Sequence, residues 1–258
     1  ALASTIDENG LPNLSPFSFF NVFSANPPIL IFSPARRVRD NTIKHTLENV
    51  RSTKEVVINV VTHDIVQQTS LSGTEYDRGV NEFEKAGFTM VPSEKVKPFR
   101  VKESPVQFEC KVIEIMALGT EGGAGNLIIC EVLLMHIDEK VLDAERQIDQ
   151  RKLDLVARAG GSFYSRAKES FFEIPKPLKS KGMGVDQLPE AVRNSKTLTG
   201  NDLGVLANTE RLPYQEDVNK FLQDNPQFHT RELNEKHKFA QEFLKKNDVE
   251  SAWKVLLS

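Results

Sequence analysis

The sequence predicts a protein that is mainly β, with peripheral helices and a helical extension at its C-terminal end. Two long runs, 106–115 and 126–138, alternate apolar and polar residues, which is typical of half-buried strands. The run 55–62 is rich in β-branched residues, which favour strands. Only helical signals follow residue 185. We therefore predict a β domain over residues 1–175, a linker rich in Lys, Pro, Gly and Ser over 176–184, and a helical extension over 185–258.

The elements between these landmarks can be placed by their turn and cap residues. Residues 1–6 resemble a strand, and Asn9-Gly10 is a strong signal for a tight turn into a second strand over 13–24. The continuously apolar run 29–33 predicts a strand buried on both faces. The expected helical segments are 41–52 with Asn41 or Thr42 as cap, 63–72, a stretch within 74–87 that stops at Gly87, one starting near Gly200, 214–224, 230–246 and 249–257.

The segment 13–24 alternates small polar residues with aromatic residues. Read at a period of two, aromatic side chains fall on both faces of the predicted strand, with hydroxyl and amide groups between them. This pattern suits a strand with core on one side and a flat, polar-edged ligand on the other. A core strand followed by a turn explains the same pattern.

Composition and charge exclude several classes of partner and site. A net charge of −3 gives no electrostatic case for binding nucleic acid or an anionic membrane surface. No apolar run approaches the roughly 20 residues of a membrane span, and no signal peptide is evident, so a cytoplasmic location is expected. Cys110 and Cys130 lie in apolar alternating runs and are expected to be buried free thiols. The histidines lack metal-ligand spacing, so no metal site is predicted.

The glycine-rich run 119–125 has the composition of a phosphate-binding loop. No Lys-Ser/Thr pair and no helix follow it, so it fails the nucleotide-binding pattern and is expected to be a hairpin connection. His136 is a lone histidine on an apolar strand. Its simplest role is that of a hydrogen-bonded core residue.

Several short motifs, in consistent order from residue 1 to residue 164, resemble the flavin reductase-like family of FMN-binding split barrels. They are residues 1–10, the Asn-Leu-Ser-Pro-Phe-Ser-Phe-Phe-Asn run at 13–21, 27–33, the Lys-His-Thr-Leu-Glu-Asn run at 44–49, 55–60, 83–87, Glu-Cys-Lys at 109–111 and 158–164. Two features depart from the family pattern. His45 stands where the family usually has Asp, and the tail after about residue 185 is not part of the pattern.

The resemblance implies a set of residues that bind FMN. Ser33, Lys44 and Thr46 would hold the phosphate, with a helix start near Asn41 adding dipole attraction. Ser15, Phe17, Ser18, Phe19 and Asn21 would supply an apolar wall and polar edge for the ring. The remaining candidates are Ser4, Thr5, Asn49, Phe163 and Tyr164, and His136 is the candidate near the flavin or nicotinamide. Without the motifs, we would expect Lys44 and Thr46 to be surface residues and the phenylalanines to be core residues.

The function that the resemblance implies is hydride transfer from NADH or NADPH to FMN, and onward to an acceptor such as a partner monooxygenase. The cofactor performs this chemistry, so the lack of an acid–base or nucleophile constellation is consistent with it. A homodimer with flavin near the subunit interface is also implied. The alternatives are an FMN-binding electron carrier or regulatory module without a dedicated NAD(P)H site, and a structural β-barrel that binds no cofactor.

Overall fold

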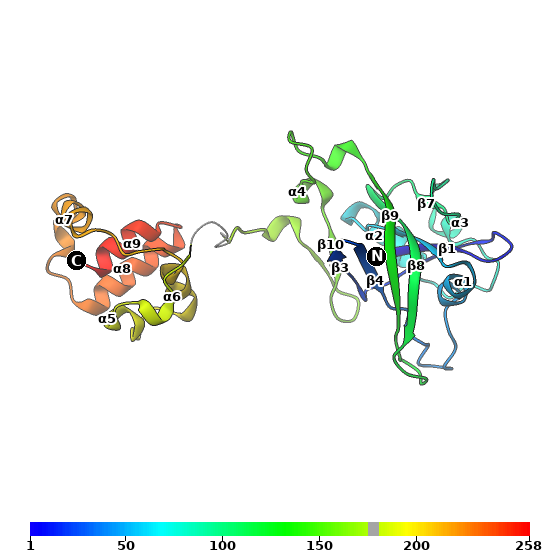
Figure 1. Ribbon diagram of the computed structural model, residues 1–258, viewed down its shortest axis with the longest axis horizontal. Coiled ribbons are helices and arrows are strands. Elements are labelled where there is room, and N and C mark those ends of the chain that lie inside the picture. Colours follow the sequence, from blue (N-terminus) through cyan, green and yellow to red (C-terminus); the bar gives the residue numbers. More distant parts are fainter. Residues whose placement is uncertain (175–180) are drawn as a thin grey trace. The chain divides into compact units, whose positions relative to one another are not determined.

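The computed structural model describes residues 1–174 and 181–258, which divide into two compact units, Ala1–Phe172 and Glu173–Ser258 (Figure 1). Of the predicted linker 176–184, residues 176–180 lie outside the described residues. No described helix has the length and apolar character needed to cross a membrane. A cytoplasmic location stays a prediction.

Unit 1 is built on a seven-stranded sheet in the order β2-β1-β5-β8-β9-β4-β3, in which every neighbouring pair of strands is antiparallel. Its strands are β1 (Leu2–Ile6), β2 (Pro12–Pro16), β3 (Phe20–Ala25), β4 (Pro28–Phe32), β5 (Glu55–Asn59), β8 (Val106–Ala117) and β9 (Asn126–Ile137). Smaller ladders join β6 (Met90–Val91) to β7 (Arg100–Val101) and β10 (Val156–Arg158) to β11 (Tyr164–Arg166). The helical segments of unit 1 are α1 (His45–Thr53), η1 (His63–Ile65), α2 (Val66–Leu71), α3 (Glu82–Ala86), η2 (Glu139–Val141), α4 (Gln150–Leu153) and η3 (Lys168–Ser170).

The predicted hairpins are confirmed. Residues 1–6 and 12–16 pair as β1 and β2, and the glycine-rich run 119–125 joins β8 to β9. The prediction of one strand over 13–24 is wrong, because the chain leaves β2 at Phe17 and starts β3 at Phe20. The two strands lie at opposite ends of the sheet order, β2 beside β1 and β3 beside β4. The alternation therefore spans two sheet edges.

Two further predictions need correction. The strand 29–33 was expected to be buried on both faces, but in β4 only Leu30 and Phe32 are buried, while Ile29 and Ile31 are half-buried. The helix expected from Asn41 begins at His45 instead. Asn41 has a φ of 57°, which a right-handed helix excludes, and its side-chain oxygen accepts a hydrogen bond from Arg36.

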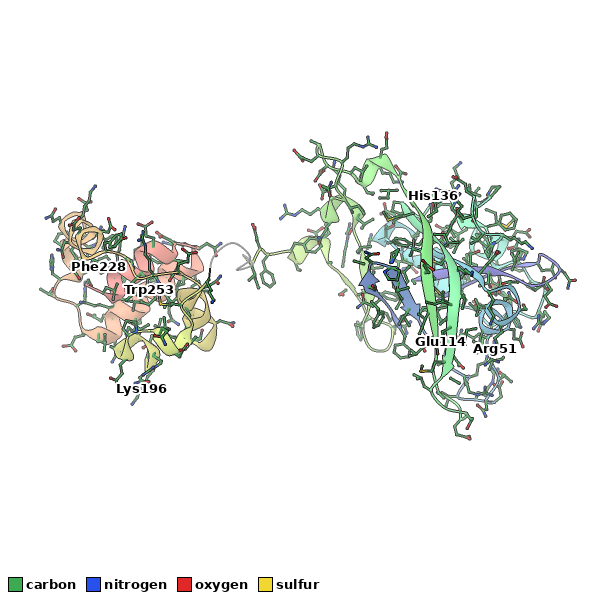
Figure 2. The ribbon with its side chains drawn as sticks, viewed as in Figure 1. Arg51, Glu114, His136, Lys196, Phe228 and Trp253 are labelled. Atoms are coloured by element: carbon green, nitrogen blue, oxygen red, sulfur yellow. The ribbon has the colours of Figure 1, made fainter. Side chains whose placement is uncertain are left out.

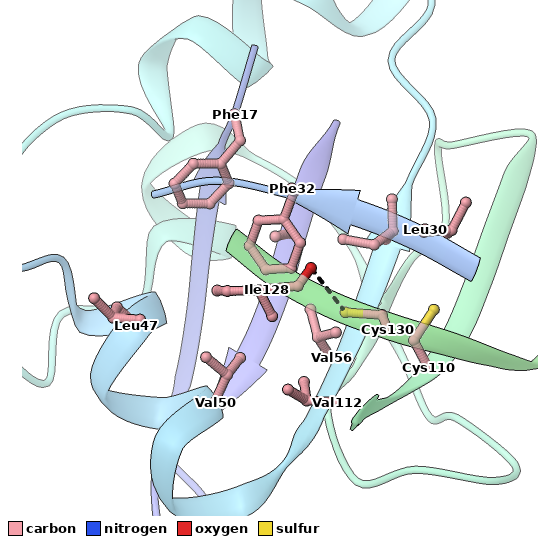
Figure 3. Packing of buried hydrophobic residues seen from close by; sticks show 12 residues of the cluster. Phe17, Leu30, Phe32, Leu47, Val50, Val56, Cys110, Val112, Ile128 and Cys130 are labelled. Atoms are coloured by element: carbon pink, nitrogen blue, oxygen red, sulfur yellow. Dashed lines mark hydrogen bonds between the residues drawn. The ribbon is translucent and has the colours of Figure 1, made fainter. Parts of the chain in front are cut away.

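The core of unit 1 lies where α1 packs on the sheet (Figure 3). Phe17 and Phe32 pack with ring centroids 5.3 Å apart beside Leu47 and Val50 of α1. Cys110 and Cys130 are buried free thiols, as predicted. Burial raises the pKa of Cys130 to about 12 and that of Cys110 still further, so both thiols stay protonated.

The described part of unit 2, from residue 181, is helical, which confirms the helical reading of the C-terminal residues. Its elements are η4 (Val185–Gln187), α5 (Glu190–Arg193), α6 (Gly200–Ala207), α7 (Gln215–Asp224), η5 (Pro226–Phe228), α8 (Leu233–Lys245) and α9 (Val249–Leu256). Helix α6 begins with a capping box between Thr199 and Asp202. Trp253 is buried and donates to the Leu206 carbonyl at 3.2 Å, and Phe228 anchors an aromatic cluster (Figure 2). Unit 2 therefore has cores of its own.

Candidate functional site

A small polar pocket, open to solvent, lies where β2, the start of α1 and the loop 72–76 meet. Three of the predicted phosphate or ring residues line it: Ser15, Lys44 and Thr46. Arg37, Glu75 and Glu82 also line it, and sequence reasoning missed them. The sequence indicates only a basic loop over 34–41, and no local pattern connects Glu82 to residues 13–46.

Two cationic side chains line this pocket, and they differ in whether a carboxylate pairs with them. The Arg37 guanidinium is 2.9 Å from the Glu75 carboxylate, whereas no carboxylate of the described residues lies within ion-pair distance of the Lys44 ammonium. Lys44 lies 5.8 Å from the centroid of the Phe17 ring. Burial, and then repulsion from Arg37, lowers the pKa of Lys44, which Glu75 partly offsets. Lys44 is thus a half-buried cation beside a hollow, an arrangement suited to an anionic ligand.

A buried network of polar side chains lies behind the pocket. Glu82 accepts from Asn13 Nδ2 at 2.9 Å and from the Leu14 N–H at 3.1 Å. Asn13 Oδ1 accepts from Thr46 Oγ1 at 2.8 Å and from Thr5 Oγ1 at 3.3 Å. Asn49 completes the chain by donating to Thr5 Oγ1 at 3.1 Å. Two more predicted residues, Thr5 and Asn49, are therefore connected to the pocket through side-chain hydrogen bonds and do not line it.

The ring-binding candidates are divided between core and surface. Phe17 is buried in the core, whereas Ser18, Phe19 and Asn21 are exposed between β2 and β3 or at the start of β3. Asn21 Oδ1 accepts from the Val22 N–H at 2.8 Å. The structure therefore holds an exposed polar and aromatic segment next to a buried aromatic wall.

Two buried hydroxyls among the candidates lack a hydrogen-bond partner within the described residues: Ser4 Oγ and Ser33 Oγ. The backbone N–H of Ser33 donates to the Phe19 carbonyl at 2.9 Å, which holds the end of β4 beside the exposed segment. Gly125 approaches Ser33 so closely that a Cβ there would lie 2.6 Å from Ser33 Oγ. A buried hydroxyl without a partner is costly, and a polar ligand would satisfy it.

The last three candidates, like most of the others, do not line the pocket. Phe163 and Tyr164 belong to the β10–β11 hairpin and are exposed, with Arg158 5.3 Å from the centre of the Tyr164 ring. His136 on β9 bonds to Glu109 at 2.7 Å and lies near the other end of the β8–β9 ladder from Glu114 (Figure 2). The bonded state of His136 agrees with the simpler of its two expected roles.

Glu109 is the centre of a second buried polar cluster. Its carboxylate is fully buried and accepts from the backbone N–H groups of Glu94, Lys95 and Val96 at 2.5 to 3.3 Å. Burial raises the pKa of Glu109, but these bonds and His136 outweigh it, so the pKa lies below its ordinary value. The cluster holds the segment 94–96 against the sheet.

One group of the described residues has donor atoms close enough together to bind a metal ion: His63, Asp64 and Asp154. Arg166 donates to both oxygens of Asp154, at 2.8 and 2.5 Å, and this bond lowers the pKa of the carboxyl. The charge of Asp154 is already neutralised by a bidentate partner. The group is therefore an ion-paired surface cluster.

Comparison with known proteins identifies the architecture that carries these residues. Residues 1–153 match the model of the flavin reductase like domain. The chain belongs to this flavin reductase-like family. A protein of Aquifex aeolicus without a characterised function is 39% identical over 164 residues, which cover 64% of this chain and 81% of that protein. Helices α5 to α9 lie outside the residues that the family model matches.

Solved structures agree with this membership. Nitrilotriacetate monooxygenase component B from Bacillus cereus is 26% identical, with a TM-score of 0.62, over 67% of this chain and 85% of its own. A Shewanella frigidimarina protein described as a flavin reductase with a split barrel domain is 28% identical, with a TM-score of 0.59, over 68% and 84%. The predicted split-barrel fold is confirmed, and the flavin reductase-like domain has a flavin-related function.

Proposed function

We propose that the flavin reductase-like domain binds FMN and acts as an NAD(P)H-dependent flavin reductase. The observation that carries this proposal is the pocket, which brings together Ser15 from one motif, Lys44 and Thr46 from a second, and Arg37 from outside both. These groups match a phosphorylated polyol, because cations bind phosphate while hydroxyls and amides bind a ribityl chain. The pocket is small and open to solvent, so the flavin ring would extend beyond it.

The remaining candidates have complementary roles in this proposal. Lys44 and Arg37 would hold the phosphate. The exposed segment with Ser18, Phe19 and Asn21 would border the ring, and the Ser33 hydroxyl would gain the partner it lacks within the described residues. When bound, FMN supplies a ring that accepts a hydride from NADH or NADPH and passes electrons to an acceptor such as a free flavin or a partner monooxygenase. The protein contributes orientation and electrostatics.

The test is an anaerobic mixing experiment on the FMN-loaded protein. With NADH or NADPH added, we expect the visible flavin band to bleach rapidly. A band that stays for minutes with both nucleotides, yet disappears with dithionite, would instead support an electron carrier without a nicotinamide site. A purified chain that is colourless and takes up no FMN on incubation would contradict both.

We also propose that the domain forms a homodimer, as the family resemblance implies. Several large apolar side chains of β3, β8 and β9 are exposed in the single chain, namely Val22, Phe23, Ile113, Met116, Leu133 and Met135. Exposed apolar surface of this kind favours a protein interface. Sedimentation equilibrium should give twice the chain mass, and Leu133→Glu should shift the chain toward monomer. A wild-type chain that sediments as a monomer at all concentrations tested would disprove the dimer.

A further inference from the structure

Glu82, which no motif assigned to the site, is a buried carboxylate whose partners are N–H donors. It lies in the first turn of α3 and is only 4% exposed. One oxygen accepts from Asn13 Nδ2 and the other from the backbone N–H of Leu14. Since both oxygens accept, the hydrogen-bond pattern suits the ionised carboxylate, which has no proton to donate. Burial raises the pKa of Glu82, and the bonds from Leu14 and Asn13 partly offset this rise.

This carboxylate fixes which way the Asn13 amide points. A carboxylate only accepts, so Asn13 must turn its NH₂ group toward Glu82 and its carbonyl oxygen toward Thr46 and Thr5. Asn49 donates to the Thr5 oxygen, so the Thr5 proton is also directed to Asn13. In the network of side-chain hydrogen bonds that joins Asn49 to Glu82, the donor and the acceptor of each bond are therefore defined.

The direction decides what Thr46 offers to the pocket that it lines. A threonine hydroxyl carries one proton, and Thr46 gives it to Asn13 Oδ1. Only oxygen lone pairs remain for a ligand, so Thr46 accepts from a hydroxyl and cannot donate to a phosphate. Arg37 and Lys44, which line the same pocket, are the donors suited to phosphate.

We propose that Glu82 is a positioning residue that orients Asn13 so that Thr46 presents an acceptor to the ligand. The pocket then has two chemically different parts: an acceptor floor for the hydroxyls of a polyol chain, and a cationic side for its phosphate. This inference rests on the proposed function, and it assigns Thr46 to the ribityl chain instead of the phosphate.

Two variants test the proposal: a single substitution that removes the carboxylate, and a double substitution that moves it to residue 13. In Glu82→Gln, the Leu14 N–H still needs an acceptor, so the new amide turns its NH₂ toward residue 13. Asn13 must then flip, and its NH₂ faces Thr46, whose proton is released into the pocket. In the double variant Asn13→Asp, Glu82→Gln, the glutamine donates to one aspartate oxygen while the other accepts from Thr46. Thr46 again donates its proton to residue 13, as in the wild type, and the net charge equals that of the wild type.

We expect Glu82→Gln to weaken binding of both FMN and riboflavin by about tenfold, since the polyol is common to both and its hydroxyl would have to change from donor to acceptor at Thr46, against its other hydrogen bonds. The double variant should recover to within about threefold. Fluorescence quenching of each flavin gives the dissociation constants. Glu84→Gln, on the exposed side of the same helix, is the matched control and should bind like the wild type. An unchanged affinity in Glu82→Gln, or a folded double variant that fails to recover, would overturn the proposal.

A second measurement needs no flavin. Nuclear Overhauser effects between the Asn13 side-chain amide protons and the Thr46 side chain should be weak in the wild type and strong in Glu82→Gln. The opposite or an unchanged pattern would refute the orienting role, even in a protein that binds FMN. If instead these effects follow expectation and neither flavin binds to the wild type, the proposed function fails while the orientation of Asn13 stands.

Discussion

Replacing Glu109 by glutamine is expected to lower the unfolding free energy of the flavin reductase-like domain by about 3 kcal/mol at pH 7. The carboxylate accepts from three successive backbone N–H groups, at residues 94–96, and from His136. A glutamine side chain offers one acceptor oxygen in place of two, and its NH₂ group would face N–H donors. Amide hydrogen exchange at residues 94–96, followed as a function of urea concentration, measures this loss of unfolding free energy in unit 1.

The same variant should change how stability depends on pH. Because the folded-state pKa of Glu109 is lowered, its contribution is fully present above its unfolded value of about 4.3 and is lost as pH falls through the folded pKa. The difference between wild type and Glu109→Gln should therefore shrink below about pH 4. Glu114→Gln, an exposed glutamate on the same strand, is the control, with an expected change within about 0.5 kcal/mol. Unaltered exchange protection in Glu109→Gln would show that other contacts hold the segment.

Replacing Lys44 by methionine is expected to weaken FMN binding by about 10- to 100-fold and to leave riboflavin binding within about twofold. Charge-assisted hydrogen bonds are worth about 1.5–3 kcal/mol, and riboflavin lacks the phosphate that would form them. Methionine keeps an apolar stem beside Phe17, so packing is largely retained. Titration of each flavin against wild type and variant supplies the two ratios.

The matched control is Arg51→Ala, which removes an exposed cation from α1, the helix that follows Lys44 (Figure 2). It should alter neither affinity, because Arg51 does not line the pocket. Lys44 loses its charge as pH rises, and its lowered pKa brings this loss to a lower pH than for an ordinary lysine. The affinity for FMN should therefore begin to fall at that lower pH. Equal losses for FMN and riboflavin in Lys44→Met would place Lys44 away from the phosphate.

Local pattern was sufficient for the strands and helices whose burial repeats regularly. The alternating residues of β8 and β9 correctly predict two long strands, although β8 has register shifts at Glu109/Cys110 and Val112/Glu114, and the Asn9-Gly10 turn fixes the β1–β2 hairpin. It failed at residues 17–19, where periodic residues continue although the chain crosses from one sheet edge to the other. Periodicity reports which side chains are buried along a segment, and it carries no information about which strand is the neighbour.

The sequence by itself determined the split-barrel family, the helical C-terminal extension and the residue types that a phosphorylated flavin requires. Only the tertiary structure decided which of them share one pocket, because Arg37, the loop 72–76 and Glu82 join it through contacts between distant segments. The tertiary structure also fixed the direction of each hydrogen bond behind the pocket. A hydroxyl or amide in a sequence can donate or accept, and the choice is made by the partner that folding places beside it, here the Glu82 carboxylate.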